Sequence, residues 1–223
     1  MDIIEVFFNW SVFVASLRPL LSGLLVTIQL GLGSILVGTA GGLIVALVRI
    51  YAPKFLRIVA TVYIDTMRAM PLLVLLILVY YALPFVGVRF SAFTSATLAI
   101  SMIAAAYAAE IFRAGIEAIP KGQFEAAQSL GLNYWQMMRD VILPQAFRIV
   151  IPPMTNNAIA IMKDTALASV VAMPELLKQA TQAQALAANP TPLVGAALIY
   201  LVMLLPLVRL VNQLENRFLS RTR

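Results

Sequence analysis

Four charged residues interrupt stretches of the chain that are otherwise apolar, and they are the first candidates for chemistry. Asp65 and Arg68 lie in one such stretch, and Lys163 and Asp164, followed by Thr165, lie in another. A charge held in hydrocarbon is costly unless it is paired or hydrated. A polar cavity that offers both signs would suit a solute with an ammonium and a carboxylate group. We therefore favour Asp164 and Thr165 as pathway groups, with Lys163, Arg68 and Asp65 as further candidates.

Local pairing is the structural alternative for these charges. Asp65 and Arg68 are three residues apart, so on a helix they share one face and can form an ion pair. Lys163 and Asp164 are adjacent and point about 100° apart on a helix, which disfavours a mutual pair. At least one of these two should face another helix or a cavity.

A third charged pair, Glu110 and Arg113, lies at the end of another apolar stretch. Because the two residues are again three apart, they can pair on one helix face. A gate and a structural salt bridge are equally good interpretations of this pair.

The sequence carries no signature of an enzyme. It contains no cysteine and no histidine, which argues against a disulfide framework, a transition-metal site and a Cys/His nucleophile system. It also has no G-x-x-x-x-G-K-[ST] loop with which to cradle the phosphates of ATP. We expect a chain that is not an enzyme and that binds no cofactor and no metal.

Composition predicts an all-α integral membrane protein. Hydrophobic residues make up 61% of the chain and charged residues 12%, against roughly 45–50% and 25% in soluble domains. The net charge of +6 is scattered between apolar runs, so we expect no nucleic-acid binding. Residues 20–48, for example, carry no charge and exceed the length needed to cross a hydrocarbon core of roughly 30 Å. The bilayer is therefore the solvent of this chain.

We expect residues 1–223 to form a single membrane domain with about five spans. The spans are predicted at residues 20–48, 58–83, 94–113, 152–173 and 193–211. The fourth is expected to begin at Pro152 and Pro153, because proline suits the first turn of a helix. Gly38, Gly42 and Ala46 recur every four residues in the first span, a spacing that lets helix backbones approach closely. Packing within the chain is the favoured interpretation of this stripe, and a dimer contact is the alternative.

Basic residues predict the orientation N-out and C-in, because short cytoplasmic loops are enriched in Lys and Arg. With this orientation ten basic residues lie on the inner side and three on the outer side. The inner ten are Arg49, Lys54, Arg57, Arg113, Lys121, Arg139, Arg148, Arg217, Arg221 and Arg223, and the outer three are Arg18, Arg89 and Lys178. The longest inner loop, about residues 114–148, is then cytoplasmic.

That loop contains a motif. Its fixed positions are Glu125, Ala126, Ala127, Gly131, Val141, Leu143 and Pro144. The spacing resembles the EAA loop of the membrane subunits of bacterial ATP-binding-cassette (ABC) importers, with Val141 in place of isoleucine. The segments Arg68–Leu73, Ala109–Ile116, Pro144–Arg148 and Lys163–Thr165 narrow the resemblance to polar amino-acid permeases of the histidine, glutamine and arginine uptake type. That family usually has serine after Lys-Asp-Thr, where this chain has Ala166.

The resemblance implies a multi-pass permease of the bacterial cytoplasmic (inner) membrane that moves a polar amino acid. It implies three protein partners: a separate ABC ATPase subunit that carries the ATP and Mg, a second permease, identical or homologous, and an extracytoplasmic amino-acid-binding protein. Glu125, Ala126, Ala127, Gly131, Leu143 and Pro144 would form the coupling contact with the ATPase. An autonomous secondary transporter or channel is the alternative function.

The residues themselves predict a short cytoplasmic helix around this motif. Glu125 is expected in its first turn, where a carboxylate favours the helix dipole, and Gly131 just beyond its end. Ala126 and Ala127 would keep one face small enough to seat in a groove of a partner. The alternative is an amphipathic helix that lies at the lipid interface.

Overall fold

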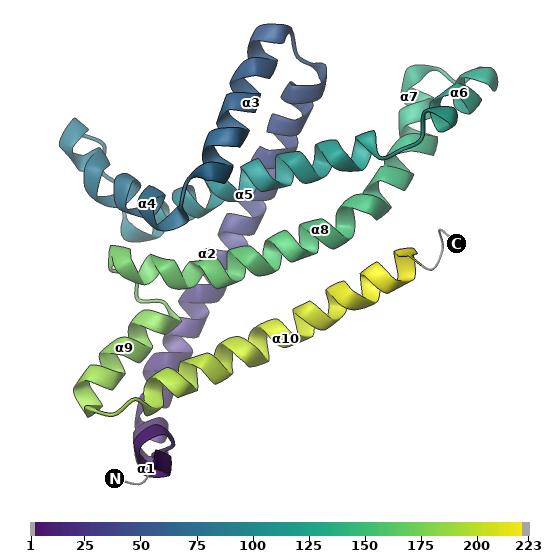
Figure 1. Ribbon diagram of the computed structural model, residues 1–223. Coiled ribbons are helices and arrows are strands. Elements are labelled where there is room, and N and C mark those ends of the chain that lie inside the picture. The colour runs from purple at the N-terminus through teal and green to yellow at the C-terminus, as the bar shows by residue number, and fades with distance from the viewer. Residues whose placement is uncertain (1–2, 220–223) are drawn as a thin grey trace.

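The computed structural model describes residues 3–219, and every regular element in that range is a helix (Figure 1). The longer α-helices are α2 (Trp10–Tyr51), α3 (Lys54–Ala69), α5 (Ala92–Glu117), α8 (Leu143–Asp164), α9 (Leu176–Ala187) and α10 (Thr191–Leu219). The shorter elements are α1 (Ile3–Phe7), α4 (Leu72–Ile77), η1 (Leu78–Ala82), η2 (Leu83–Val86), α6 (Lys121–Ser129), α7 (Tyr134–Met137), η3 (Met138–Ile142) and η4 (Thr165–Val171). The predicted all-α class is confirmed.

Helix α2 is the element on which the others assemble. Its first turn is capped by the Asn9 side chain, which accepts a hydrogen bond from the Val12 N–H at 3.1 Å. At 1.5 Å per residue its 42 residues are about 63 Å long, well beyond a hydrocarbon core of roughly 30 Å. It packs most extensively against α5 and also contacts α3, α8, α9 and α10.

One face of α2 is lined with small residues that admit these neighbours. A Cβ atom added at Gly38 would lie 2.6 Å from the Ala104 Cβ, and one at Gly42 would lie 2.5 Å from the Ala108 Cβ. These contacts are closer than real Cβ atoms approach, so only glycine fits between α2 and α5. The stripe predicted from spacing therefore serves packing within the chain.

Three helices in the described part are long and apolar enough to cross a membrane. They are Glu5–Tyr51, Ala92–Glu117 and Thr191–Gln213. A fourth span results if the bent pair Lys54–Ala69 and Leu72–Val86 is counted as one. The sequence predicted five. The difference is α8, which has the length of a span but carries prolines, asparagines and charges that lower its apolarity.

The second predicted span, residues 58–83, is not one straight helix. The axis turns by 104° between α3 and α4. Met70, at the bend, has extended backbone angles because Pro71 disfavours the helical conformation in the residue before it. The sequence pattern placed the break only at Pro84 and Gly87. Gly87 does end the segment, with a left-handed φ of 85°.

The fourth predicted span begins earlier than Pro152 and Pro153. Helix α8 starts at Leu143, directly after the π-helical segment η3, and both prolines lie in its interior. A proline removes one backbone hydrogen bond without ending a helix that its neighbours support, which membrane helices tolerate. Much of the segment predicted as loop, residues 114–148, is accordingly helical.

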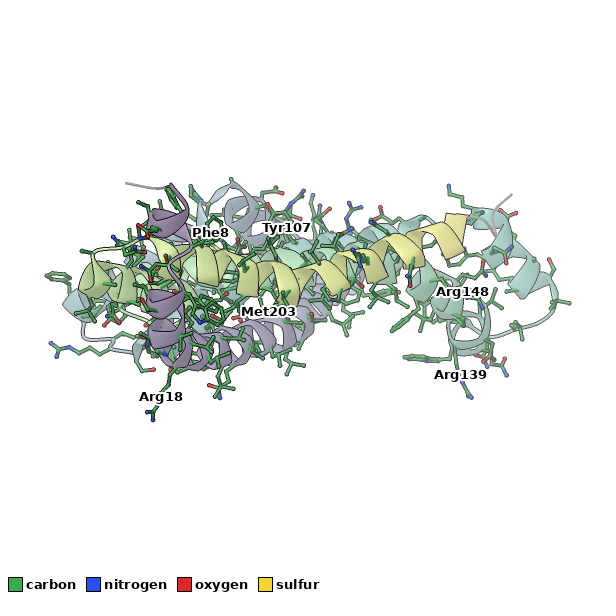
Figure 2. The ribbon with its side chains drawn as sticks, turned by 90° about the horizontal axis from the view of Figure 1, so that it is seen from below. Phe8, Arg18, Tyr107, Arg139, Arg148 and Met203 are labelled. Atoms are coloured by element: carbon green, nitrogen blue, oxygen red, sulfur yellow. The ribbon has the colours of Figure 1, made fainter. Side chains whose placement is uncertain are left out.

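Two ends of the molecule are distinct. At one end the Asn9 N–H donates to the Thr191 hydroxyl at 3.0 Å, which joins the starts of α2 and α10. At the other end α6 and α7 extend beyond the long helices (Figure 1), and Figure 2 shows Arg139 and Arg148 there, far from Phe8. The start of α2 and the α9–α10 turn therefore lie at the same end of the molecule, and the N-out, C-in orientation stays a prediction. Arg221 and Arg223, which contributed to that prediction, lie outside the described residues.

Candidate functional site

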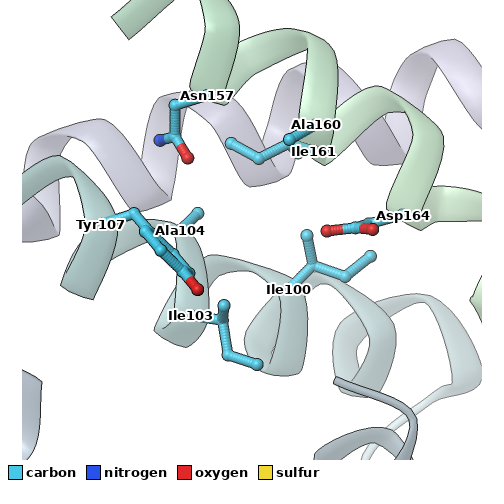
Figure 3. A pocket seen from close by; sticks show the side chains of 8 residues that line it. All are labelled: Ile100, Ile103, Ala104, Tyr107, Asn157, Ala160, Ile161 and Asp164. Carbon is cyan, nitrogen blue, oxygen red and sulfur yellow. The ribbon is translucent and has the colours of Figure 1, made fainter. Parts of the chain in front are cut away.

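A cavity of about 210 Å³ lies between α5 and α8 (Figure 3). Its lining residues are Ile100, Ile103, Ala104, Tyr107, Asn157, Ala160, Ile161 and Asp164. On both helices they recur at intervals of three and four residues, so each set forms one helix face. Asp164 and Asn157 supply polar groups from α8, and Tyr107 adds an aromatic ring and a hydroxyl from α5. Asp164 is the one charged residue among these eight.

The structure separates the five residues predicted as pathway groups. Asp164 lines the cavity, whereas the neighbouring Lys163 is exposed. Thr165 is fully buried, and its hydroxyl donates to the Met162 carbonyl at 2.7 Å. The adjacent charges of Lys163 and Asp164 thus point to different surroundings, as expected from their 100° offset.

Asp65 and Arg68 do not form the local ion pair that their spacing allows, within the range of residues that the structure describes. Both are exposed on α3. The Arg68 guanidinium lies over the Tyr107 ring, 5.5 Å from its centroid, which is cation–π geometry. Because Tyr107 also lines the cavity, Arg68 is brought to the rim of that cavity.

Sequence reasoning did not single out Tyr107 or Asn157. Asn157 lies seven residues before Asp164, which places both on the same face of α8. An amide two turns from a carboxylate in an apolar helix is a signal that could have found it. For Tyr107 no comparable local signal exists, because its partner Arg68 belongs to another helix.

Glu110 forms a structural ionic cluster. Its carboxylate pairs with Arg49 of α2, and its second oxygen accepts from the Arg113 Nη2 at 2.8 Å. Arg113 also pairs with Glu117 one turn further along α5. Of the two interpretations that the sequence left open, the salt bridge is observed, and it ties α2 to α5 at the end where α6 begins.

The motif around Glu125 forms the predicted short helix, α6. Its C-terminus is a Schellman turn, in which the Gly131 N–H donates to the Gln128 carbonyl at 2.9 Å and the Leu132 N–H to the Ala127 carbonyl at 3.2 Å. Gly131 has a φ of 75°, the left-handed conformation that glycine adopts at little cost. The predicted role of Gly131 as the residue that ends the helix is confirmed.

Two details of this helix differ from the expectation. It starts at Lys121, so Glu125 lies in its second turn and not in its first. The helix dipole therefore gives no particular reason for a carboxylate at that position. Ala126 is exposed, but Ala127 is only 2% exposed. Ala127 belongs to a buried apolar cluster, so its small size serves packing within the chain.

This cluster seats α6 against the start of the long helical segment α7–η3–α8. Its buried members are Ile119, Ala127, Met137, Met138, Ile142 and Ala146. Around it, large apolar side chains face outward, and Leu130 and Trp135 are each 80% exposed. Leu143 and Pro144, the last residues of the motif, are exposed in the first turn of α8. The motif thus combines a packed side with an exposed apolar side.

Comparison with known proteins identifies the class. Residues 38–220 match the family described as the binding-protein-dependent transport system inner membrane component. The probable amino-acid ABC transporter permease protein YckA of Bacillus subtilis (strain 168) is 42% identical over 79% of this chain and 78% of its own length. The arginine transport system permease protein ArtQ of the same organism is 35% identical over 95% of this chain and 98% of its own length.

A solved structure agrees with these relatives. The crystal structure of an amino acid ABC transporter with histidines superimposes with a TM-score of 0.86 at 37% identity, over 92% of this chain and 96% of that one. The chain belongs to the binding-protein-dependent transport system inner membrane component family. It is a multi-pass permease subunit of the inner membrane, and its relatives are named as transport subunits.

Proposed function

We propose that this permease moves a polar amino acid across the cytoplasmic membrane, with the cavity between α5 and α8 as part of the route. The observation that carries the proposal is Asp164, which places a carboxylate in an otherwise mostly apolar cavity. A carboxylate at this position would attract the ammonium group that every free amino acid carries. Asn157 and the Tyr107 hydroxyl offer hydrogen bonds to the rest of the solute.

The size of the cavity supports a small solute. At about 210 Å³ it lies below the roughly 300–1,000 Å³ of sites for drug-sized ligands. The names of the Bacillus subtilis relatives, which include arginine, glutamine and cystine permeases, support an amino acid. Arg68 at the rim can serve the carboxylate of such a solute, because its guanidinium lies over a ring face and forms no ion pair within the described residues. Lys163, Thr165 and Asp65 are not among the residues that line the cavity.

We further propose that α6 docks a separate ABC ATPase subunit on the cytoplasmic side, consistent with the N-out, C-in orientation. The exposed Glu125 and Ala126, with Leu143 and Pro144 nearby in the motif, face outward, while Ala127 and Gly131 fix the helix. The exposed side chain of Leu130 gives this surface an apolar contact. ATP and Mg would then be bound by the partner.

The complete importer would contain two permeases and two ATPases, with an extracytoplasmic amino-acid-binding protein as donor of the solute. An α5–α8 cavity in a bundle of this size is narrow for an alternating pathway, which favours a second permease, identical or homologous. The family to which the chain belongs is described as binding-protein-dependent, which supports such a donor.

The proposal is tested by reconstitution. The chain is coexpressed with a candidate ABC ATPase and a candidate amino-acid-binding protein from the same genome, purified and placed in liposomes, and uptake of radiolabelled amino acids is measured with and without ATP. Uptake that requires ATP, the ATPase and the binding protein supports the proposal. Gradient-driven uptake by the permease alone would instead establish the alternative, an autonomous secondary transporter or channel.

A further inference from the structure

Glu175 is fully buried, although it lies in a segment between two predicted spans that is polar in sequence. It precedes α9, and its carboxylate accepts hydrogen bonds from the N–H groups of Leu177 at 2.8 Å and Lys178 at 2.6 Å. These bonds cap the helix. Glutamate is not among the preferred capping residues, which are the shorter Ser, Thr, Asp and Asn. Its extra length therefore calls for a second explanation.

That explanation is a contact with α10. The Tyr200 hydroxyl donates to the Glu175 Oε2 at 3.1 Å. The same hydroxyl lies beside the hydroxyls of Thr27 on α2 and Thr165 on η4, both fully buried. The Leu176 N–H donates to the Thr27 hydroxyl at 3.1 Å, which closes the cluster. An aspartate would cap α9 equally well but would fall short of α10.

The cluster encloses the segment that follows the cavity residue Asp164. Thr165 comes directly after Asp164, and Glu175 comes after the turn that ends η4. Tyr200 thus contacts Thr165, the first residue of η4, and Glu175, which caps the helix that follows η4. Close packing also restrains this segment: a Cβ atom added at Gly23 would lie only 2.9 Å from the Leu176 Cα, and one at Gly31 would be in van der Waals contact with the Thr165 Cγ2 at 3.5 Å.

We propose that Glu175 and Tyr200 are positioning residues, which hold the α8–η4 junction so that the Asp164 carboxylate faces the cavity between α5 and α8. The inference rests on the proposed function of that cavity. Breaking the Glu175–Tyr200 contact weakens the restraint that α10 places on this junction, because the Tyr200 hydroxyl beside Thr165 is then no longer held by the carboxylate. Asp164 would turn with the junction, and the cavity would lose its negative charge without losing any lining residue.

The test measures the electrostatic potential in the cavity. Because the chain has no cysteine, Ala160→Cys provides a single thiol, one turn from Asp164 and on the same cavity wall. Its reaction rates with a cationic and an anionic methanethiosulfonate reagent are compared in membranes that contain the full chain. With the Asp164 carboxylate roughly 6 Å from the thiol, the cationic reagent should react faster relative to the anionic reagent. The ratio of the two rates should be about tenfold higher than in the Asp164→Asn variant.

Two variants break the contact in different ways. Tyr200→Phe removes the hydroxyl, and Glu175→Asp keeps the charge and the cap but shortens the reach. We expect both to lower the rate ratio at least about threefold, toward the Asp164→Asn value. Tyr63→Phe is the matched control, because it removes a tyrosine hydroxyl bond of 2.8 Å to Met102 between α3 and α5. In that variant the ratio should stay at its parent value.

The outcomes separate this inference from the proposed function. A rate ratio that stays at the parent value in both Tyr200→Phe and Glu175→Asp overturns the positioning role, whatever uptake does. A ratio that falls while Asp164→Asn transports normally supports the positioning role and refutes the pathway role of Asp164. If Tyr200→Phe does not insert stably, the decision rests on Glu175→Asp, which retains the α9 cap.

Discussion

The residue that ends α6 allows a prediction about the stability of this helix, because its backbone conformation shows whether a substitution stabilises or destabilises the helix end. Gly131 has a φ of 75°, and a Cβ added there would meet no atom within 4 Å. The only penalty for a side chain at this position is therefore conformational. Left-handed backbone costs an L-residue roughly 1–2 kcal/mol, and a β-branched residue is the least tolerant of it. Bulk as such should matter little.

Gly131→Val is consequently the informative substitution. A loss of about 1–2 kcal/mol reduces the population of the Schellman turn by roughly fivefold to thirtyfold relative to other conformations of this segment. The helix α6 would lose two terminal hydrogen bonds, those to Gln128 and Ala127. The exposed face of α6 would then no longer be held in one orientation relative to the rest of the chain. Gly131→Asn should be much milder, because asparagine tolerates the left-handed region.

Gly122 offers a matched control in the same helix. A Cβ added at Gly122 would also meet open space, but the backbone at this position is helical. Gly122→Ala should therefore stabilise α6 by roughly 0.5–1 kcal/mol. Substitution of Gly131 is thus expected to destabilise α6, whereas substitution of Gly122 is expected to stabilise it.

The assay follows ATP hydrolysis and amino-acid uptake in the same reconstituted vesicles, with and without loaded binding protein. We expect Gly131→Val to insert normally but to lose uptake or binding-protein-stimulated hydrolysis, while Gly131→Asn and Gly122→Ala retain both. Full stimulation together with full uptake in Gly131→Val would refute α6 as the coupling element.

Asp164→Asn should reduce ATP-driven uptake while copurification with the ATPase persists, and unchanged uptake kinetics would remove Asp164 from the pathway. Gly42→Ala should destabilise the chain by about 1–3 kcal/mol, because its Cβ would lie 2.5 Å from that of Ala108. Gly33→Ala, with no atom within 4 Å, is the control in thermal unfolding, and equal melting temperatures for the two would contradict the packing argument. Burial raises the pKa of the Glu175 carboxyl above its ordinary value of 4.5. The contribution of this carboxyl to the free energy of unfolding is therefore full below that value and is lost as pH rises through the raised pKa. The melting temperature of Glu175→Gln relative to the parent should therefore increase across that window, whereas a constant difference between about pH 4 and about pH 8 would contradict the shift.

Local sequence was sufficient for several features. The length and apolarity of the helices follow from consecutive residues, so the membrane class and the helical fold could be predicted. The Schellman turn at Gly131 and the close approach at Gly38 and Gly42 were also predictable, because each depends on residue type and short spacing. Asp164 could be selected because an isolated charge in an apolar helix needs a polar environment.

What those residues contact depends on the packing of distant helices. Pro71 bends the second span, whereas α8 continues through Pro152 and Pro153, and spacing alone cannot distinguish a proline that ends a helix from one that neighbouring helices support. Arg68 turns from Asp65 to the ring of Tyr107 because α5 passes beside α3.

Glu175 shows the same limit most clearly. Its sequence context is polar and alanine-rich, yet α2, α9 and α10 converge on it and exclude water completely. That the chain is helical and that its long apolar stretches reach the length of a bilayer could be predicted from the amino-acid sequence, since those properties are set by neighbours along the chain. Which charges are buried, and which partners satisfy them, is set by helices far apart in sequence, whose packing no local pattern encodes.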